Sequence, residues 1–417
     1  MKVLWFSNSP ASGAEYLKSG GIGGGWLSAL DQPLGKKIEL HIAFYYPKFA
    51  KPFIYKDVYY HPICKKNFKW NWVKQLFYNK LIDGEDLSFY MNIIYEVKPD
   101  VIHILGTENS FGIITKHTEI PIVVSIQGNI TVYKQKYFAG IETRYAHLRD
   151  TSSLLAFLNS RSFFEYFVRF ERFSQIELRN LSTVKHIIGR TNWDRRIMSI
   201  MAVNAQYYHN EEVLRKAFYE HQWVPEKREK LIIHTTNGNS IYKGFETLCE
   251  ALFEINQLGI PIEWRVAGIK ESDIIVQMVK KKLNSRFPNS GLVLLGGINE
   301  SDLVEKLLEA DMYVMPSHIE NSPNNLCEAM ILGMPCIATF AGGTGSMLKD
   351  GEEGILIQDG DPWVLAGAIL ELRSKPEKAI EYGIKAREKA LKRHNSDNIV
   401  NSLIDIYSTI IENGEKN

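Results

Sequence analysis

Short apolar runs alternate with longer helical patterns along the whole sequence, and this alternation restricts the fold more than any other feature. It predicts parallel sheets with helices on both faces. Five runs in each half of the chain are typical of strands: Lys2–Ser7, Ile38–Phe44, Val101–Leu105, Ile122–Ile126, His186–Gly189, Leu231–Thr235, Glu263–Ala267, Leu292–Leu295, Met312–Met315 and Cys336–Thr339. Helical patterns fill the gaps, among them Gly244–Gln257, Glu300–Ala310 and Asn324–Leu332. We therefore predict an α/β protein with two Rossmann-like, doubly wound parallel-sheet domains.

The two sets of strands meet near His221–Lys230, a charged stretch that contains the helix-breaking Pro225. A chain of 417 residues also exceeds what one hydrophobic core usually organises. We predict a first domain over residues 1–225 and a second over 226–395. Ligands of doubly wound sheets bind at the carboxyl ends of the strands, so a central cleft that both domains face is the expected site.

Composition excludes several classes of protein. Hydrophobic residues make up 45% of the chain and charged residues 23%, values typical of a soluble globular protein. No apolar run approaches the length of a transmembrane helix, and the first residues lack the apolar segment of a secretory signal. The four cysteines form no C-x-x-C pair and no zinc spacing, which indicates reduced thiols and a cytoplasmic location. Dispersed basic residues and a net charge of +1 argue against nucleic-acid binding.

The first half of the chain is basic and rich in aromatic residues. Met1–Arg190 carries 24 Lys and Arg against 16 Asp and Glu. Thirteen aromatic residues lie between Leu40 and Lys80, and Arg161–Ser182 forms a helical pattern with arginines on one side and phenylalanines on the other. Three interpretations stay open. The aromatic residues form ordinary core, they form a surface that stacks on sugars, or this half contacts the inner face of a membrane that carries a lipid-diphosphate-linked acceptor.

A glycine cluster, Gly20–Gly25, begins 13 residues after the first strand. A dinucleotide-binding turn follows its strand directly, so this spacing argues against a nicotinamide site. The cluster suits either a plain loop or a loop that brings backbone N–H groups close to an anion. In the second half, Lys243 follows a strand and precedes a helix, where a cation can hold a diphosphate.

Residues 316–330 are the most informative stretch. Ser322 has the chemistry of a helix N-cap, and Pro323 suits the first helical position. The N–H groups of Asn324, Asn325 and Leu326 would then form an anion site at the helix start. Glu320 precedes the helix and Glu328 lies in its second turn. Carboxylates accept hydrogen bonds from vicinal hydroxyls, so this pair fits a sugar on one side of a phosphate and a ribose on the other.

Glu320 and Glu328 form an E-x7-E pattern. Because of this pattern and of the segments Lys243-Gly244, Gly333–Ala338 and Gly342–Thr344, the chain resembles family 4 of the retaining glycosyltransferases, in particular the type that builds bacterial surface polysaccharides. The resemblance implies the GT-B fold, with a helix over about 396–417 crossing back to the first domain. It implies a nucleotide-sugar site in the second domain and an acceptor site in the first. The site residues that it implies are Glu328 for the ribose, Glu320 for the donor sugar, and Ser240, Lys243, Ser322, Asn324, Asn325, Leu326, Gly20 and Gly21 around the diphosphate.

Two positions depart from the family pattern. Gln127 stands where many members have a histidine near the donor sugar, and Gly238 stands where many have an arginine near the diphosphate. Gln127 can donate a hydrogen bond but cannot titrate. The resemblance implies retention of configuration by a front-face route, with Lys243 and helix N–H groups stabilising the leaving phosphate and with Gln127 and Glu320 beside the sugar. It implies no metal and no cofactor.

The sequence thus predicts a retaining hexosyltransferase that moves a sugar from a UDP- or GDP-sugar to a glycan or lipid-diphosphate-linked acceptor in bacterial polysaccharide synthesis. The predicted location is the cytoplasm, with contact at the inner face of the membrane. Two alternatives stay open: a catalytically inactive subunit that binds sugar nucleotides, and an NDP-sugar 2-epimerase.

Overall fold

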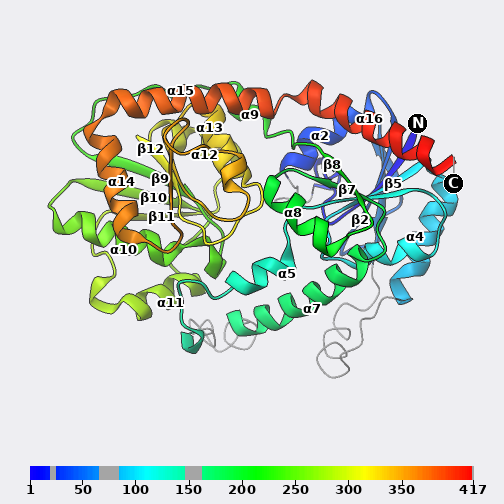
Figure 1. The fold of residues 1–417 in the computed structure, drawn as a ribbon, viewed down its shortest axis with the longest axis horizontal. Helices are drawn as coiled ribbons and strands as arrows, with labels where there is room; N and C mark the ends of the chain where they lie inside the picture. The colour runs from blue at the N-terminus through cyan, green and yellow to red at the C-terminus, as the bar shows by residue number, and fades with distance from the viewer. Residues whose placement is uncertain (19–24, 65–83, 146–161, 416–417) are drawn as a thin grey trace. The chain divides into compact units, whose positions relative to one another are not determined.

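The computed structural model describes residues 1–18, 25–64, 84–145 and 162–415, and the chain divides into two compact units. Unit 1 comprises Met1–Ile130, Phe173–Arg215 and His394–Asn417, and unit 2 comprises Thr131–Arg172 and Lys216–Arg393. Each unit contains its own sheet with helices packed against it (Figure 1).

The sheet of unit 1 has the strand order β3-β4-β2-β1-β5-β6-β7-β8. Its strands are β1 (Lys2–Ser7), β2 (Glu39–Tyr45), β3 (Phe53–Tyr55), β4 (Val58–Ile63), β5 (Val101–Leu105), β6 (Ile122–Ser125), β7 (His186–Gly189) and β8 (Gln206–His209). All neighbours are parallel except β3 and β4, which form an antiparallel hairpin at one edge. Residues 3–6 of β1 are fully buried, as expected for a parallel strand covered on both faces.

The helices of unit 1 come from both ends of the chain. They are α1 (Gly13–Tyr16), α2 (Gly25–Gly35), α4 (Gly84–Val97), α8 (Asn192–Met201) and α16 (Ser396–Glu415), with the 3-10 turn η1 (Ser110–Lys116). α16 is last in the sequence, and its apolar side, which includes Leu403 and Tyr407, joins the core formed by β1 and β2. The helix expected over about 396–417 is therefore present, and it packs on unit 1.

The Tyr407 hydroxyl is expected to contribute measurably to the stability of unit 1. It accepts a hydrogen bond from Trp5 Nε1 at 2.9 Å and lies 2.6 Å from His103 Nδ1, and all three side chains are buried. Burial lowers the pKa of His103 to about 3, so its ring is neutral. Tyr407→Phe leaves two buried groups without a partner and should cost about 1–3 kcal/mol of unfolding free energy. Urea unfolding measures this, with Tyr95→Phe at an exposed position as the control; equal midpoints for both variants would contradict it.

The sheet of unit 2 has the order β11-β10-β9-β12-β13-β14, and the paired strands are all parallel. Its strands are β9 (Leu231–Thr236), β10 (Ile262–Ala267), β11 (Leu292–Gly296), β12 (Met312–Met315), β13 (Cys336–Thr339) and β14 (Ile355–Ile357). In sequence terms this is the order 3-2-1-4-5-6, which is the order of dinucleotide-binding Rossmann domains. The order reverses between β9 and β12.

The helices of unit 2 cover both faces of its sheet (Figure 1). They are α5 (Ile130–Tyr133, whose first residue falls in unit 1), α9 (Lys216–Tyr219), α10 (Phe245–Gln257), α11 (Ile274–Leu283), α12 (Glu300–Leu308), α13 (Asn324–Leu332), α14 (Pro362–Ser374) and α15 (Pro376–Arg393). Short 3-10 turns are η2 (Lys134–Lys136), η3 (Thr143–Tyr145), η4 (Ile241–Lys243), η5 (Asn284–Arg286) and η6 (Thr344–Ser346). α10 packs with α11 and α14, and α13 packs with α9 and α15, so the two groups form separate layers.

Two segments that the sequence analysis kept in the first domain group with unit 2 instead. The first segment is residues 131–172, of which Tyr137 and Ile141 are buried in the core of unit 2. In the second, residues 216–225, the Trp223 backbone N–H donates to the Leu332 carbonyl and its Nε1 donates to the Ala310 carbonyl, both at 2.7 Å. These long-range contacts place the division at 215/216 rather than at the charged stretch with Pro225.

The aromatic side of the helical pattern at Arg161–Ser182 is partly core. It forms α7 (Phe163–Leu181), in which Phe163 is buried while Phe167 and Phe170 pack against the core of unit 2. This supports the interpretation as ordinary core for these aromatic residues. The aromatic residues between 65 and 80 lie outside the described residues.

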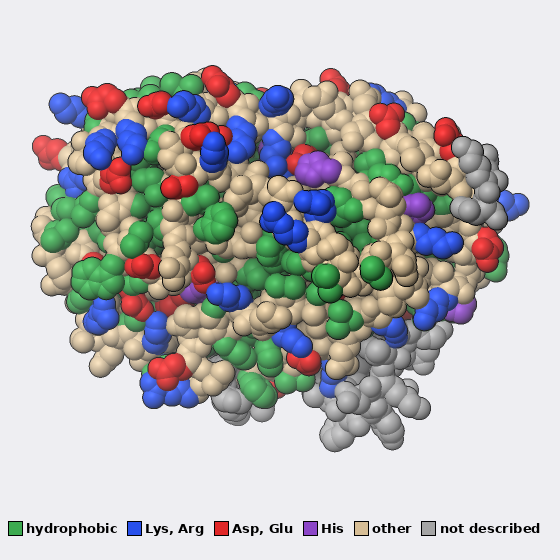
Figure 2. Space-filling view, viewed as in Figure 1, with side chains coloured by type: hydrophobic (Ala, Val, Ile, Leu, Met, Phe, Trp, Pro, Cys, Tyr) green, Lys and Arg blue, Asp and Glu red, His purple; other side chains and the backbone are tan. Residues whose placement is uncertain are grey.

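No described helix has both the length and the apolar character needed to cross a membrane. On the face shown in Figure 2, acidic and basic side chains are mixed over α14 and α15. Lysines of α15 form ion pairs with Glu381 of the same helix, from Lys385 at 2.5 Å, and with Glu353 before β14, from Lys389 at 3.2 Å.

All ten predicted strands are present, five of them with the predicted bounds, and the prediction of two Rossmann-like parallel-sheet domains is confirmed. The sequence analysis missed β3, β4, β8 and β14. β3 and β14 have three residues each, β4 contains Pro62, and β8 is half exposed and has no apolar run.

Candidate functional site

The reversal of strand order in unit 2 places two loops side by side. One loop follows β9 and leads through η4 into α10; the other follows β12 and leads into α13. The two loops touch through their backbones, since the His318 N–H donates to the Tyr242 carbonyl at 2.8 Å. Ligands of such sheets bind outside the carboxyl ends of the strands at this point of reversal.

Lys243 and Glu320 face each other across these two loops. Lys243 Nζ lies 2.6 Å from Glu320 Oε1, and the two side chains are 25% and 6% exposed. Burial lowers the pKa of Lys243, but the charge of Glu320 and their hydrogen bond outweigh burial, so the pKa lies above its ordinary value. The lysine is therefore a cation with one accessible side. The sequence analysis assigned these two residues separate contacts and did not predict the ion pair.

The backbone of Glu320 is fixed by the loop that follows β13. The Gly343 N–H donates to the Glu320 carbonyl at 2.9 Å, and a Cβ on Gly342 would lie 2.0 Å from the same oxygen. Gly342 also has a φ of +56°. The left-handed backbone and the close approach require glycine at position 342, and the Gly343 N–H holds the Glu320 carbonyl. The resemblance implies the same Gly342-Gly343 pair.

Gly244 lets the Lys243 loop approach the loop after β12. Its φ is +72°, and a Cβ there would lie 2.0 Å from the Pro316 carbonyl oxygen. Gly244→Ala should lower the unfolding free energy by about 2 kcal/mol, because alanine must adopt a left-handed backbone and displace Pro316. Differential scanning calorimetry measures this against Gly367→Ala, an exposed helical position with nothing within 4 Å. Equal stability of the two variants would contradict the close approach.

The start of α13 differs from the prediction. The helix begins at Asn324 with Pro323 in the cap position, not with Ser322 there. The Pro323 carbonyl accepts from the Leu326 N–H at 3.1 Å and from the Cys327 N–H at 3.2 Å, so the proline carbonyl forms the first helical bonds. The Oγ of Ser322 is buried and has no hydrogen-bond partner within the described part of the chain. The prediction of Ser322 as N-cap is wrong.

The remaining predicted donor residues of unit 2 also lie on these elements. Asn325 Nδ2 donates to the Thr236 carbonyl at the end of β9, at 2.8 Å. Ser240 precedes η4 at the carboxyl end of β9, and its carbonyl accepts from the Lys243 N–H at 3.2 Å. Glu328 is buried in α13 with 5% exposure. Gly238 stands in place of the family arginine, and a Cβ added to it would meet nothing within 4 Å among the described residues, so this position of the loop is open.

Gln127 follows β6 in unit 1, and its backbone is held by Arg190. The Nη2 atom of Arg190 donates to the carbonyls of Ile126 and Gln127 at 3.1 and 3.0 Å, and the guanidinium pairs with Glu212. Arg190 directly precedes the N-cap residue of α8, Thr191, which forms a capping box with Asp194. Gly20 and Gly21 lie outside the described residues.

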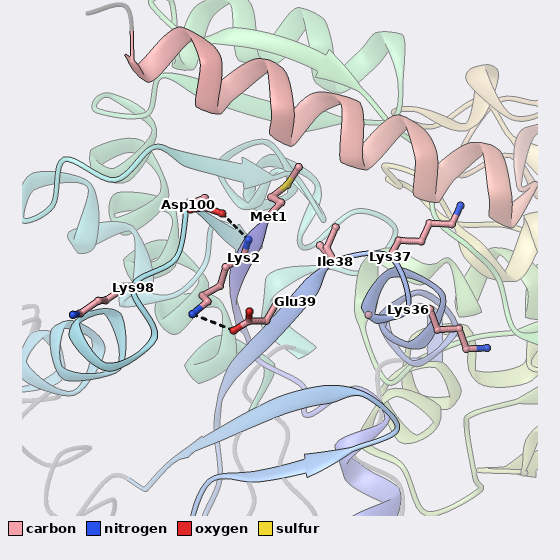
Figure 3. A pocket seen from close by; sticks show the side chains of 9 residues that line it. Met1, Lys2, Lys36, Lys37, Ile38, Glu39, Lys98 and Asp100 are labelled. Carbon is pink, nitrogen blue, oxygen red and sulfur yellow. Dashed lines mark hydrogen bonds and ion pairs between the residues drawn. The ribbon is translucent and has the colours of Figure 1, made fainter.

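Unit 1 has a hollow at the opposite end of its strands from Gln127. It lies at the amino ends of β1 and β2 and is lined by Lys2, Lys36, Lys37, Lys98 and the acidic residues Glu39 and Asp100 (Figure 3). Lys2 Nζ pairs with Glu39 at 3.1 Å, and its backbone N–H donates to Asp100 at 2.7 Å. Because ligands of parallel sheets bind at the carboxyl ends, this hollow is not a candidate donor site.

Residues 218–389 match the family model described as "Glycosyl transferases group 1". This segment contains both Lys243 and Glu320. A Salmonella typhimurium protein named as a colanic acid biosynthesis glycosyltransferase is 26% identical over 176 residues, which is 40% of this chain and 42% of that protein. The matching stretch spans less than half of the first curated relatives.

Solved structures resemble the chain over nearly its full length. Sucrose-phosphate synthase from Thermosynechococcus elongatus has a TM-score of 0.74 at 13% identity, and the superposition covers 99% of this chain and 99% of that chain. An Anabaena HepE structure in complex with UDP and glucose has a TM-score of 0.64 at 14% identity, covering 98% of this chain and 99% of that one. At such identities the likeness shows the fold, which is the two-domain GT-B fold.

Proposed function

We propose that this protein transfers a sugar from a nucleotide-diphosphate sugar to a hydroxyl group of an acceptor, because residues 218–389 match the model of the group 1 glycosyl transferases. One observation carries the proposal: the Lys243–Glu320 pair at the point in the sheet of unit 2 where the strand order reverses. A cation next to a carboxylate suits a diphosphate joined to a polyhydroxyl sugar.

The donor binds along the loops after β9 and β12 in this proposal. Lys243 holds the diphosphate together with Ser240 and with Ser322, Asn324 and Asn325 around the start of α13; Leu326 does not take part, because its backbone N–H donates to the Pro323 carbonyl. Glu320 accepts hydrogen bonds from the sugar, and Glu328 accepts them from the ribose. The nucleotide in this proposal is UDP or GDP.

We propose that transfer retains the anomeric configuration and that no metal or cofactor takes part. The bond between the anomeric carbon and the diphosphate oxygen breaks, and the acceptor oxygen forms its bond on the same face. The acceptor proton passes to the leaving phosphate oxygen. Lys243 stabilises the charge that develops on that oxygen, while Glu320 holds the sugar.

The acceptor in this proposal is a glycan or a lipid-diphosphate-linked sugar of bacterial polysaccharide synthesis, bound by unit 1 in the cytoplasm at the inner face of the membrane. Relatives named for colanic acid and teichuronic acid biosynthesis support the polysaccharide role. The excess of basic residues in the first half of the chain supports contact with an anionic surface.

Release of nucleoside diphosphate tests the proposal. UDP-glucose, UDP-N-acetylglucosamine and GDP-mannose are each incubated with the protein, with and without a mixed glycan acceptor. We expect release from one donor, and Glu320→Gln should slow it by about 100-fold or more because a charge-assisted contact is lost. Binding without turnover of any donor would favour the inactive subunit, and conversion to a 2-epimer would favour the epimerase.

A further inference from the structure

A buried histidine of unit 2 lies two residues before Glu320 and contacts two carboxylates. His318 is 3% exposed; its Nε2 is 2.6 Å from Glu246 Oε1, and its Nδ1 is 3.3 Å from Asp359 Oδ2. Glu246 belongs to α10, and Asp359 follows β14. Lys136 of η2 completes the cluster through an ion pair of 3.1 Å with Asp359. Three elements distant in the sequence therefore meet at one imidazole.

The charges of this cluster balance only when the imidazole is protonated. Glu246 and Asp359 each carry one negative charge and Lys136 carries one positive charge, so His318 supplies the second positive charge. Burial lowers the pKa of His318, but the hydrogen bond and charge of Glu246, followed by those of Asp359, raise it above its ordinary value. Both ring N–H groups then donate, one to each carboxylate.

The main chain at Gly140 closes over the same pair. A Cβ on Gly140 would lie 2.1 Å from Glu246 Oε1 and 2.7 Å from His318 Nε2, and the φ of this residue is +77°. Only glycine fits here. The close backbone covers the His318–Glu246 contact, which is consistent with the 1% exposure of Glu246.

The histidine is also hydrogen-bonded to the loop that carries Lys243. Its backbone N–H donates to the carbonyl of Tyr242, the residue before Lys243, at 2.8 Å. On the other side, Glu320 is anchored through its carbonyl to the Gly343 N–H. The segment from His318 to Glu320 is thus fixed at both ends, and the imidazole is its buried anchor.

We propose that His318, held between Glu246 and Asp359, is a positioning residue that keeps the loop bearing Glu320 in place and so maintains the Lys243–Glu320 pair. Its importance for donor binding rests on the proposed function, whereas its effect on the loop does not. The sign of the pH dependence follows from the raised pKa of His318. The contribution is fully present below the ordinary pKa of histidine and is lost as the pH rises through the raised value.

Amide hydrogen exchange of the ligand-free protein tests the effect on the loop. His318→Gln has one donor nitrogen where protonated histidine has two on opposite sides of the ring, and it carries no charge, so residues 317–322 and the Gly343 amide should exchange about tenfold faster than in the wild type. In the wild type, the protection of these amides should decline as the pH rises above about 6.5, after correction for intrinsic exchange; in the variant it should not change. Unaltered protection and an unaltered pH profile in His318→Gln would overturn the proposal, even if the melting temperature fell.

Two further variants separate positioning from general destabilisation. Glu246→Gln keeps the size of the side chain but removes its charge, and it should abolish the pH dependence of exchange at 317–322. Glu254→Gln is the matched control, because Glu254 lies on the same helix and pairs with Arg286. This variant should keep the pH dependence of exchange at residues 317–322. If His318→Gln does not fold, a proton NMR titration of His318 in the wild type decides: a pKa at or below about 6.5 would contradict the role.

A second experiment tests whether the position of this loop affects binding of the donor. The dissociation constants of UDP and GDP are measured for the wild type, His318→Gln and His221→Gln, an exposed histidine of the same unit. We expect about tenfold weaker binding in His318→Gln only, a change of about 1.4 kcal/mol. Failure of the wild type to bind either nucleotide would contradict the proposed function, and the exchange experiment would still decide the positioning role. Equal affinities of the three proteins would contradict the link between His318 and the donor.

Discussion

Replacing Lys243 with alanine is expected to lower the rate of sugar transfer by about 100- to 1,000-fold, the range observed when one preorganised group that stabilises a developing oxyanion is removed. Lys243 is the cation that faces Glu320 between the two loops, and its side chain is still 25% exposed, so a ligand can reach it. The loss should appear in kcat as well as in kcat/KM, because charge on the leaving phosphate develops in the transition state.

Lys281→Ala is the matched control for this variant. Lys281 lies on α11 in the same unit and is exposed. Circular dichroism and thermal unfolding must accompany the kinetics, because Lys243→Ala also leaves the Glu320 carboxylate, 6% exposed, without its cation. A folded Lys243→Ala protein that transfers sugar at the wild-type rate would show that Lys243 does not act on the diphosphate.

Replacing Arg190 with methionine is expected to destabilise the protein by about 3–5 kcal/mol, because it leaves a buried carboxylate without its partner. Arg190 is 5% exposed and Glu212 is 4% exposed, and their side chains form an ion pair. The same guanidinium donates to the carbonyls of Ile126 and Gln127, which also lose a donor. Guanidinium chloride unfolding gives the free energy.

The double variant Arg190→Met with Glu212→Gln separates the charge from the rest. Removing both charges should recover more than half of the lost stability, since the isolated buried charge is the main cost. If the double variant is as unstable as Arg190→Met alone, the cost comes instead from the two carbonyls and the packing of the guanidinium. In that case the ion pair between Arg190 and Glu212 does not account for the stability that Arg190→Met loses.

The sequence predicts strands well where they are buried on both faces of a parallel sheet. β1, β5, β7, β12 and β13 have the predicted bounds, because each is a short run of mostly apolar residues between turns. β4 carries Pro62 and half-buried residues, and β8 has no apolar run, so neither has the pattern of a buried strand. Their pairing depends on neighbours that composition does not reveal.

The sequence predicted which loops and helices carry the site residues, but not which of these residues contact each other. Lys243 and Glu320 lie on the expected loops, yet their ion pair joins residues 77 positions apart and follows from the strand order β9-β12. His318 was visible beside Glu320, but its partners are 72 and 41 positions away. Ser322 was misplaced because a serine before a proline also fits a position one residue outside the cap, as it does here.

Thermal unfolding with four nucleoside diphosphates and one monophosphate tests most directly whether unit 2 binds the donor at Lys243. UDP, GDP, ADP, CMP and dTDP are each added to the wild type and to Lys243→Ala. A nucleotide at about 100 times its dissociation constant stabilises the folded state by about 2.7 kcal/mol. The account predicts that one nucleoside diphosphate raises the unfolding temperature of the wild type and has a much smaller effect on Lys243→Ala. No shift with any nucleotide, or equal shifts in the two proteins, would contradict it.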